Sequence, residues 1–269
     1  MADLCIVTTC MGRLAALKQS LGPMLGQAGA SGVVVVDYSC PEGAGDWVEA
    51  NYPAARVVRV PGRTAFNASA ARNIGARHAD APWICFVDSD IVLAPGFATA
   101  LAPALRSGGF YRLWSTDAGL VGTFACSRAD FERVGGYDEV YACWGEEDND
   151  LYDALEFVGL ESRQLPAPLP RHLAHDDADR TRHYPVVDKT LGHAINRVYR
   201  LMKWDTARLR RELLTVEMRR NLYDKVAEVV TASLPSGQPG DLGVHQPIGL
   251  VPGGWSLSRI MTYRLTRDP

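Results

Sequence analysis

The sequence predicts an α/β fold in which helices flank a mostly parallel central sheet, followed by a mainly helical C-terminal extension. Short apolar runs rich in β-branched residues alternate with stretches of helical spacing, which is the pattern of β-α-β units. Hydrophobic residues make up 47% of the 269 positions, enough for a sizeable core. After about residue 185 the sequence becomes helical and charged. We therefore expect one domain over residues 1–185 and an extension over residues 186–269.

The first part of the predicted domain has the pattern of parallel strands joined by helices. Apolar runs that end at polar or turn residues predict buried strands at Leu4–Thr8, Val33–Val36, Arg56–Val60 and Trp83–Val87. A helix is expected over Arg13–Leu25, because leucines recur there at spacings of three and four. The Ala-rich stretch Thr64–Ala79 predicts a second helix.

The second part of the predicted domain mixes helices and strands. Pro95 favours the start of a helix, which is over by Gly108. Two further strands are predicted at Phe110–Leu113 and Leu120–Cys126, and a helix from about Glu146 to Val158.

The composition excludes several classes of protein. The formal net charge is -3 and the pI is near 6.1, so no basic excess favours nucleic acid as a partner. The longest wholly apolar stretches are only a few residues, too short to cross a bilayer. The N-terminus has no basic segment, so no signal peptide is expected. Six scattered cysteines, never spaced as C-x-x-C, indicate reduced thiols, and we expect a cytoplasmic protein.

Two acids follow the predicted strand at Trp83–Val87, in the sequence Asp88-Ser89-Asp90. In open α/β sheets, ligands bind beyond the carboxyl ends of the strands. Two carboxylates one residue apart suit a hard divalent cation that also accepts phosphate oxygens. Acids are also common in solvated turns, and the pair taken alone favours that interpretation.

An acid lies among apolar residues in the predicted helix after residue 146. Asp148 lies four residues after Trp144 and three before Leu151, which places these three on one helical stripe. Burying a carboxylate is costly unless it is paired or hydrogen-bonded. Capping of the helix N-terminus by acids accounts for Glu146 and Glu147 better than it accounts for Asp148.

Two histidines three residues apart, His172 and His175, follow a Pro-rich segment and precede two aspartates. This spacing lets both imidazoles approach one ion if the backbone is extended or turned, so a metal site is one hypothesis. A lone histidine is more often structural or exposed. The chain has no P-loop, dinucleotide-binding, G-x-S-x-G or H-E-x-x-H pattern, so the corresponding sites lose support.

Taken in order, these elements resemble the GT-A fold glycosyltransferases. The strand–helix–strand start, the stretch Phe66–Gly75 and the stretch Trp83–Asp90 are similar to the nucleotide-sugar half of family 2 enzymes. Gly135–Glu139, followed by Trp144-Gly-Glu-Glu-Asp148, resembles the acceptor half shared by β-1,4-galactosyltransferases, chondroitin-polymerase domains and polypeptide GalNAc-transferases. The resemblance covers roughly residues 4–183. It implies a nucleotide-sugar half at about 1–95 and an acceptor half at about 96–185.

The resemblance implies a metal and donor site. Asp90 is expected to coordinate Mn²⁺ or Mg²⁺ at the donor diphosphate, and Asp88 to contact the ribose or the metal. His175 matches the metal-binding histidine of the family, and His172 is a further candidate ligand. The stretches expected to hold the nucleotide contain Thr8, Arg13, Asp37, Phe66, Arg72, Asp88 and Ser89.

The resemblance also implies a catalytic base and an acceptor site. Asp148 matches the base of inverting enzymes, which takes the proton of the acceptor hydroxyl as that oxygen attacks the anomeric carbon. Trp144 and Glu147 match residues that hold the acceptor or the donor sugar. Glu146 stands where the family commonly has the second Gly of W-G-G-E-D, so the acceptor of the relatives does not transfer.

The expected activity is metal-dependent, inverting transfer of a hexose or N-acetylhexosamine from a nucleotide-sugar, with UDP the preferred nucleotide. The donor and a glycan or other hydroxyl acceptor are then the partners. Arg180 and Arg182 are either a lid over the diphosphate or part of a solvated loop. Two other functions stay open: a metal-dependent nucleotide-sugar hydrolase or pyrophosphatase, and a catalytically silent sugar-nucleotide-binding module.

The extension has an amphipathic, basic stretch followed by a Pro- and Gly-rich segment. Residues 186–232 are expected to be helical and residues 234–240 to form a loop or linker. The basic face suggests packing on the domain, homodimerisation, or peripheral contact with an anionic membrane, and the first two are favoured. Its charged residues are Lys203, Arg208, Arg210, Arg211, Arg219 and Arg220.

Overall fold

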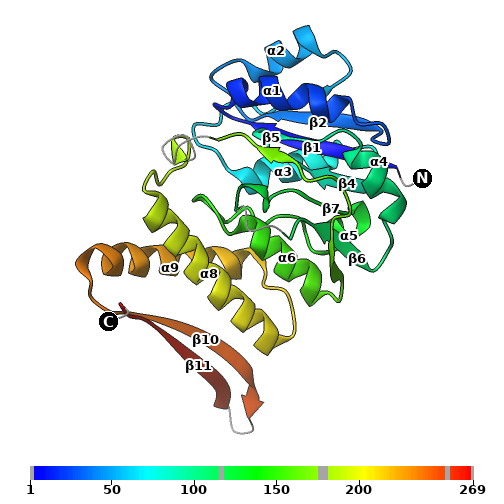
Figure 1. The fold of residues 1–269 in the computed structure, drawn as a ribbon. Coiled ribbons are helices and arrows are strands. Elements are labelled where there is room, and N and C mark those ends of the chain that lie inside the picture. Colours follow the sequence, from blue (N-terminus) through cyan, green and yellow to red (C-terminus); the bar gives the residue numbers. More distant parts are fainter. Residues whose placement is uncertain (1–2, 115–117, 175–180, 252–254, 268–269) are drawn as a thin grey trace. The chain divides into compact units, whose positions relative to one another are not determined.

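The chain divides into two compact units, Met1–Val187 and Asp188–Pro269, in the computed structural model (Figure 1). The structure describes all residues except 1–2, 115–117, 175–180, 252–254 and 268–269. The first unit is built on a seven-stranded sheet in the order β3-β2-β1-β4-β7-β6-β8. It therefore has the mixed α/β architecture that the sequence predicts.

Parallel pairing covers most of the central sheet. The four strands β1 (Leu4–Cys10), β2 (Gly32–Asp37), β3 (Arg56–Arg59) and β4 (Trp83–Phe86) pair in parallel. Strand β7 (Phe124–Ser127) is antiparallel to both of its neighbours, β4 and β6. The edge pair β6 (Gly109–Arg112) and β8 (Glu161–Gln164) is parallel again. The carboxyl ends of β1, β2 and β4 consequently lie at one edge, where a ligand site is expected.

Helices cover both faces of this sheet. Strand β1 alternates, with Leu4 and Ile6 in one core cluster and Cys5 and Val7 in the other. The first cluster includes apolar residues of α1, and the second includes residues of α3 and α6. Among the residues that the structure describes, the first unit has the helices α1 (Leu14–Leu25), α2 (Ala44–Asn51), α3 (Ala68–Arg77), α4 (Phe97–Leu101), α5 (Arg128–Arg133) and α6 (Glu147–Phe157). Short 3-10 turns lie at Ala102–Ala104 and Ala118–Leu120. Helices α2 and α5 are not predicted from the sequence, because they are too short to show a clear helical periodicity.

Helix α3 packs closely on the sheet and so places the residues that follow its first turn. Asn67 caps the helix, because its side chain accepts a hydrogen bond from the backbone N–H of Ala70 at 2.8 Å. A Cβ at Gly75 would lie 2.4 Å from Cγ1 of Val7 and 3.0 Å from Cγ2 of Val36. Only glycine allows this approach, so the helix is held tightly against β1 and β2.

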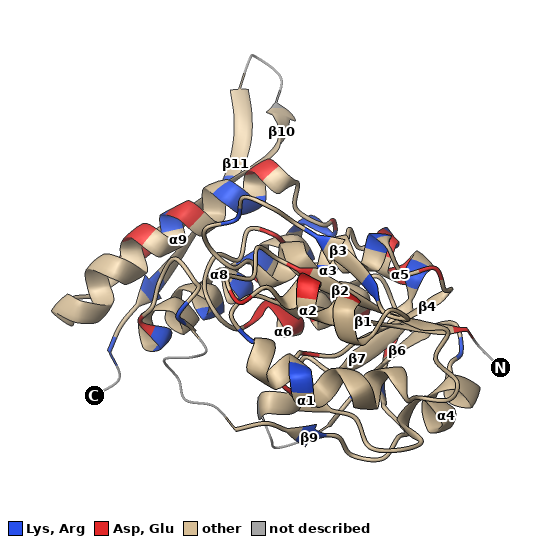
Figure 2. Ribbon diagram, turned by 90° about the horizontal axis from the view of Figure 1, so that it is seen from above, with Lys and Arg blue, Asp and Glu red and all other residues tan. Residues whose placement is uncertain are grey.

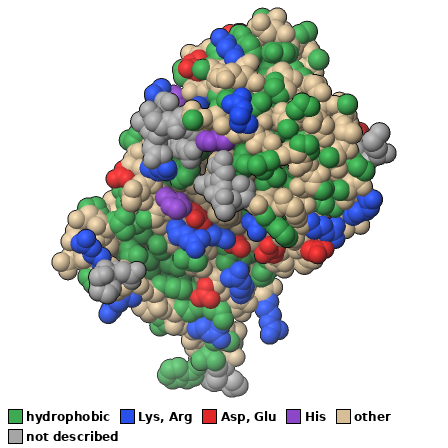
Figure 3. All heavy atoms as spheres, in the orientation of Figure 1, with side chains coloured by type: hydrophobic (Ala, Val, Ile, Leu, Met, Phe, Trp, Pro, Cys, Tyr) green, Lys and Arg blue, Asp and Glu red, His purple; other side chains and the backbone are tan. Residues whose placement is uncertain are grey.

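The second unit contains two long helices and a hairpin. Helix α8 (Lys189–Arg210) and helix α9 (Val216–Ser236) pack together, and the Tyr223 hydroxyl donates to Asn196 Oδ1 at 2.9 Å. The strands β10 (Gly240–Val251) and β11 (Trp255–Leu265) form an antiparallel pair. The free end of this hairpin carries exposed apolar side chains, seen as green spheres in Figure 3.

Three expectations for the extension need correction. The predicted loop at 234–240 is wrong in part, because α9 continues through Pro235 to Ser236. The hairpin was not predicted, although β11 alternates apolar and polar residues as a strand does. Lys203 is buried, 5% exposed, and its ammonium lies 5.2 Å from the ring centre of Trp204, so it is not part of an exposed basic face. Acidic and basic residues also alternate along α9 (Figure 2).

Among the helices of the described residues, none is long and apolar enough to span a bilayer.

Candidate active site

Four charged side chains from three separate segments meet at the edge formed by the strand ends. Arg72, in α3, reaches Asp88 after β4 through an Nη2–Oδ1 contact of 2.7 Å. Its other terminal nitrogen lies 3.0 Å from Oε1 of Glu147 and 3.4 Å from Oδ1 of Asp148, at the start of α6. The Arg72 side chain is only 7% exposed, so the ion pairs are largely shielded from solvent. Arg72 thus joins the predicted donor motif to the predicted acceptor motif.

Tyr137 contacts both Asp148 and Arg72 in this cluster. Its hydroxyl donates to Asp148 Oδ1 at 3.1 Å, and its ring centre lies 5.1 Å from the Arg72 guanidinium carbon. Its backbone is fixed to α3, because Tyr137 N donates to Asn73 Oδ1 at 2.8 Å and Asn73 Nδ2 donates to Tyr137 O at 2.9 Å. The adjacent pair Arg72-Asn73 therefore holds both the carboxylates and the tyrosine that contacts one of them.

The surroundings of Asp148 favour its protonated form. Burial raises the pKa of Asp148 to about 7; Arg72 opposes this shift, and the nearby Glu147 and Asp88 carboxylates add to it. Burial and then Asp148 raise the pKa of Tyr137 well above its usual value, so this hydroxyl keeps its proton and stays a donor. Burial disfavours the charged form of Arg72, but Asp148 and Asp88 outweigh it and hold the pKa of Arg72 well above its usual range. A carboxyl group whose pKa lies near 7 is suited to accept a proton at neutral pH.

Asp90 and His172 face each other on the side of the cluster where β5 (Ile91–Val92) pairs with β9 (Arg171–His172). Asp90 Oδ2 and His172 Nε2 lie 3.8 Å apart, and each side chain is 16% exposed. The backbone is fixed here, because Leu173 N donates to Asp90 O at 2.8 Å. A carboxylate oxygen and an imidazole nitrogen side by side fit the ligand preferences of Mn²⁺.

Not all of the predicted metal ligands lie among the residues that the structure describes. Among those residues, no group of three or more His, Cys, Asp or Glu side chains is gathered as a metal cage. His175 and Arg180 lie outside the described part of the chain. Asp88, the other predicted ligand, forms an ion pair with Arg72 through one of its carboxylate oxygens. Asp90 and His172 are therefore the predicted ligands that the structure places together.

The residues predicted to hold the nucleotide line the same edge of the sheet. Thr8 is buried in β1, and its hydroxyl has no hydrogen-bond partner among the described residues. Phe66 lies edge-on between Tyr38 and Tyr184, with ring centres 5.8 and 5.6 Å away. The carbonyl of Ser89 accepts from the hydroxyl of Ser20, on α1, at 2.6 Å.

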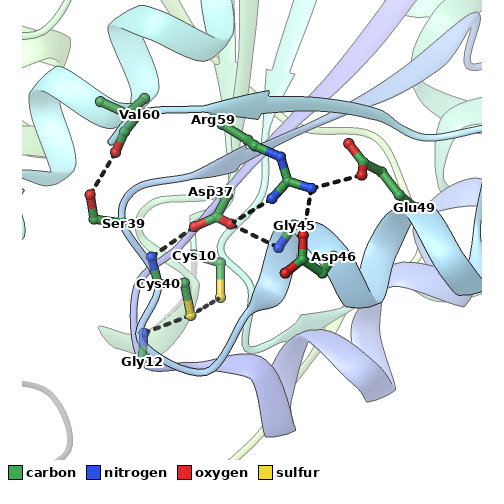
Figure 4. A network of polar contacts seen from close by, with 10 residues as sticks. All are labelled: Cys10, Gly12, Asp37, Ser39, Cys40, Gly45, Asp46, Glu49, Arg59 and Val60. Atoms are coloured by element: carbon green, nitrogen blue, oxygen red, sulfur yellow. Dashed lines mark hydrogen bonds and ion pairs between the residues drawn. The ribbon is translucent and has the colours of Figure 1, made fainter. Parts of the chain in front are cut away.

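Asp37 and Arg13 shape the turns beside this edge. The Asp37 carboxylate accepts hydrogen bonds from Cys40 N at 2.7 Å and Gly45 N at 2.9 Å, which ties the end of β2 to the start of α2 (Figure 4). Arg13 comes directly before α1, and its carbonyl accepts from Leu17 N at 3.0 Å. Their contact with a nucleotide stays a prediction.

The predicted acceptor residues need one correction. Helix α6 begins at Glu147, so Trp144 precedes it and does not share a helical stripe with Asp148. Glu146 has a φ of 71°, in the left-handed region that favours glycine. This conformation is the physical reason why a glycine suits the position, and here a carboxylate occupies it. Glu147 is directed to Arg72, and Arg182 is exposed.

Sequence reasoning did not assign a role to Tyr137 or Gly122. Tyr137 belongs to the motif Gly135–Glu139, and its place in this motif is the sequence feature that could have indicated a role in the site. A Cβ at Gly122 would lie 2.6 Å from Asp88 Oδ2 and 3.3 Å from both Arg72 Nη2 and Asp148 Oδ2. Nothing in the local sequence indicates that Gly122 lies against all three.

Gly122→Ala is expected to displace the Asp88 carboxylate and to lower activity at least tenfold. Asp88 cannot simply move away, because Arg72 holds it; overpacking of this kind costs about 1–3 kcal/mol. Thermal unfolding and sugar-transfer rates measure the two effects. Gly32→Ala is the matched control, since an added methyl there meets no atom within 4 Å. Unchanged activity in Gly122→Ala would show that the close packing around Asp88 is unimportant.

Two family models match the chain. Residues 5–131 match Glycosyl transferase family 2, and residues 104–176 match the N-terminal domain of galactosyltransferase. The chain is 27% identical to β-1,4-galactosyltransferase 2 of Mus musculus over 164 residues, 55% of this chain and 43% of the relative. It is 29% identical to the Homo sapiens protein of that name over 135 residues, 45% of this chain and 36% of the relative. The chain thus spans less than half the length of these relatives.

Solved structures share the fold at low identity. The mannosyltransferase PcManGT of Pyrobaculum calidifontis, in complex with GDP-Man and Mn²⁺, has a TM-score of 0.56 and 16% identity, with 88% of this chain and 78% of that chain covered. GalNAc-T7 with UDP, GalNAc and Mn²⁺ has a TM-score of 0.58 and 13% identity, with 88% and 58% covered. Together with the sheet and the matched models, these likenesses lead to one conclusion. The chain has the GT-A fold of glycosyltransferases, and it is similar to glycosyl transferase family 2 over residues 5–131 and to the galactosyltransferases over residues 104–176.

Proposed function

We propose that the protein is a metal-dependent, inverting glycosyltransferase that moves a hexose or N-acetylhexosamine from a UDP-sugar to an acceptor hydroxyl. One observation carries the proposal: Asp148, with a pKa raised to about 7, lies in one cluster with Arg72 and the Asp88 that follows β4. The similarity to β-1,4-galactosyltransferase 2 supports galactose as a first choice of sugar, and the likeness to GalNAc-T7, solved with UDP, supports UDP as the nucleotide. Residues 1–95 then form the nucleotide-sugar half and residues 96–185 the acceptor half.

Asp148 is the base in this proposal. Inverting transfer needs a base on one face of the sugar and a leaving diphosphate on the other. The Asp148 carboxylate accepts the proton of the acceptor hydroxyl while that oxygen attacks the anomeric carbon. Tyr137 orients the carboxylate, and Arg72 stabilises its charged form. Trp144, Glu146 and Glu147 lie close by in the sequence and border the acceptor.

Asp90 and His172 hold the divalent ion, with His175 and Asp88 as further candidates. A bound Mn²⁺ or Mg²⁺ supplies Lewis-acid stabilisation of the charge on the leaving diphosphate. The pairing of β5 with β9 and the hydrogen bond from Leu173 N to Asp90 O hold the backbones of Asp90 and His172 side by side. A cytoplasmic location, a lid at Arg180 and Arg182, and homodimer or peripheral membrane contacts of residues 186–269 stay predictions.

Nucleotide binding tests the donor site directly. We expect UDP with Mn²⁺ to stabilise the protein against thermal unfolding by about 2.7 kcal/mol at a hundred times its Kd, and UDP alone to do much less. The panel includes GDP, CDP, dTDP and ADP, each with and without Mn²⁺. Asp90→Ala is expected to remove the Mn²⁺-dependent part, whereas Asp3→Asn, at the opposite end of β1, is the control.

Two outcomes contradict the proposal. A panel in which no nucleotide stabilises the protein removes the support for a donor site. Steady hydrolysis of the nucleotide-sugar that no acceptor accelerates shows a hydrolase instead of a transferase.

A further inference from the structure

Two cysteine thiols that the proposed reaction does not use lie together (Figure 4), beside the edge of the sheet where the residues predicted to hold the nucleotide lie. Cys10 is the last residue of β1, and Cys40 follows the end of β2 by three residues. Their sulfur atoms lie 3.9 Å apart, in hydrogen-bond contact. An S–S bond is about 2.05 Å long, so the two sulfurs have to approach each other by about 2 Å to form one.

The two sulfurs differ in their surroundings. Cys40 Sγ accepts a hydrogen bond from Gly12 N at 3.2 Å, and Figure 4 shows it between that amide and Cys10. The hydrogen bond from Cys10, followed by backbone N–H groups of residues 12, 42 and 44, lowers the pKa of Cys40 to about 6 despite burial. The same contact, together with burial, raises the pKa of Cys10 well above its usual value. Cys40 is thus the more acidic of the two thiols.

The other buried cysteines of the sheet contrast with this pair. Burial raises the pKa of Cys85 to about 12 and that of Cys5 to about 11, so both are inert thiols at neutral pH. Cys40 is 9% exposed, next to the exposed Pro41 and Glu42 at the rim of the turn. Cys40 thus lies in a turn whose next two residues are exposed, whereas Cys85 is fully buried within β4.

The turn that carries Cys40 also carries a predicted donor residue. Cys40 N donates to Asp37 Oδ1, and Gly45 N donates to Asp37 Oδ2. Arg59 Nη1 lies 3.5 Å from the same carboxylate, and its other nitrogen contacts Asp46 and Glu49. Movement of Cys40 toward Cys10 pulls on the hydrogen bond that orients Asp37.

We propose that Cys40 is a site of oxidation by peroxides, with Cys10 as its resolving thiol, and that the resulting disulfide weakens donor binding. The Cys40 thiolate attacks one peroxide oxygen and breaks the O–O bond, which with one proton yields a sulfenic acid and water or an alcohol. The Cys10 sulfur then attacks the Cys40 sulfur, and the hydroxyl leaves as water with the proton from Cys10. The peroxide is reduced by two electrons and the two thiols are oxidised. The thiol chemistry is independent of the proposed function, and only the effect on donor binding rests on it.

Thiol counting and peptide mass spectrometry test the chemistry on the full chain. After hydrogen peroxide, we expect the six free thiols to fall to four, with a single Cys10–Cys40 disulfide that dithiothreitol reverses. Cys40→Ala is expected to keep its five remaining thiols, while Cys10→Ala accumulates a sulfenic acid that dimedone traps at Cys40. Cys5→Ala, a buried cysteine on the same strand, is the matched control and still forms the disulfide. Six thiols after treatment, or a disulfide between other cysteines, overturns the proposal.

Nucleotide binding tests the consequence. We expect the oxidised protein to bind UDP with Mn²⁺ at least fivefold more weakly than the reduced protein, and dithiothreitol to restore binding. If the disulfide forms and the affinity for UDP is unchanged, the proposal that the disulfide weakens donor binding is wrong. If the reduced protein binds no nucleotide, the proposed function fails, while the disulfide result still decides the thiol chemistry.

Discussion

Asp148→Asn is expected to reduce kcat by about 10²–10⁴ while the protein stays folded, because the amide accepts no proton from the acceptor hydroxyl. Asn has nearly the same shape and keeps an oxygen for the hydrogen bond from Tyr137. Donor binding is expected to change little. Asp153→Asn, on the same helix, is the matched control and is expected to keep its activity. If Asp148→Asn keeps more than a tenth of the wild-type kcat, Asp148 is not the base.

The pH dependence follows from the same carboxyl group. Because the pKa of Asp148 is about 7, we expect kcat/KM of the wild-type enzyme to rise about tenfold per pH unit below 7 and to level off above it. Asp148→Asn is expected to lose this rise. A wild-type profile that is flat between pH 5 and 8 contradicts a base whose pKa is raised.

Stability separates a catalytic loss from a folding defect. The pKa of Asp148 is raised from a usual value of 3.8 to about 7, so the folded protein keeps a proton that the unfolded chain releases between these values. This site therefore reduces wild-type stability as pH rises from about 4 to 7. The Asn variant lacks this dependence, and we expect it to be more stable than wild type by about 1–3 kcal/mol at pH 8, but by little at pH 4. Denaturant unfolding at both pH values measures the difference.

Arg72→Met is expected to lower the free energy of unfolding by about 3–5 kcal/mol and to abolish activity. It leaves the carboxylates of Asp88, Glu147 and Asp148 close together without their cation, and the side chains of Glu147 and Asp148 are only 10% and 14% exposed. Arg72→Lys keeps the charge but not the two-pronged guanidinium, so we expect an intermediate loss. Urea unfolding and transfer assays measure both effects.

The control and the pH dependence make the Arg72 prediction specific. Arg77→Met, on the same helix but exposed, is expected to change stability by less than about 0.5 kcal/mol. In Arg72→Met the carboxyl groups lose the cation that favours their charged forms. The free energy of unfolding therefore falls most at pH values where Asp148 is ionised in the wild type. The deficit is expected to be largest above pH 7 and to shrink in acid. A deficit that is equal at pH 5 and 8 shows that Arg72 acts through packing instead of charge.

Much of the first unit is predictable from local sequence patterns. The apolar runs at β1, β2 and β4 mark buried parallel strands, and Asp88 and Asp90, which follow β4, lie at the carboxyl edge as expected. The helix with Asp148 was also predicted to within a residue at each end. These features depend on residues a few positions apart, so periodicity and turn residues are enough to locate them.

The arrangement of the candidate site depends on contacts that span long stretches of the chain. Arg72 and Glu147 are 75 residues apart, and they meet because α3 packs on β1 and β2 while α6 packs in the same core cluster. The position of Arg72 in its motif predicts contact with the nucleotide, because it carries no information about α6. Tyr137 and Gly122 likewise gain their roles only from the neighbours that folding places beside them.

Local spacing and apolar runs were enough to predict the fold class, the parallel strands β1, β2, β3 and β4 and the acids that follow β4. The pairing of Arg72 with three carboxylates, the burial that raises the pKa of Asp148 to about 7 and the contact between Cys10 and Cys40 follow from the tertiary structure. Electrostatic shifts and thiol reactivity depend on distances of a few ångströms between residues remote in sequence. Those distances are set when the helices and strands dock together.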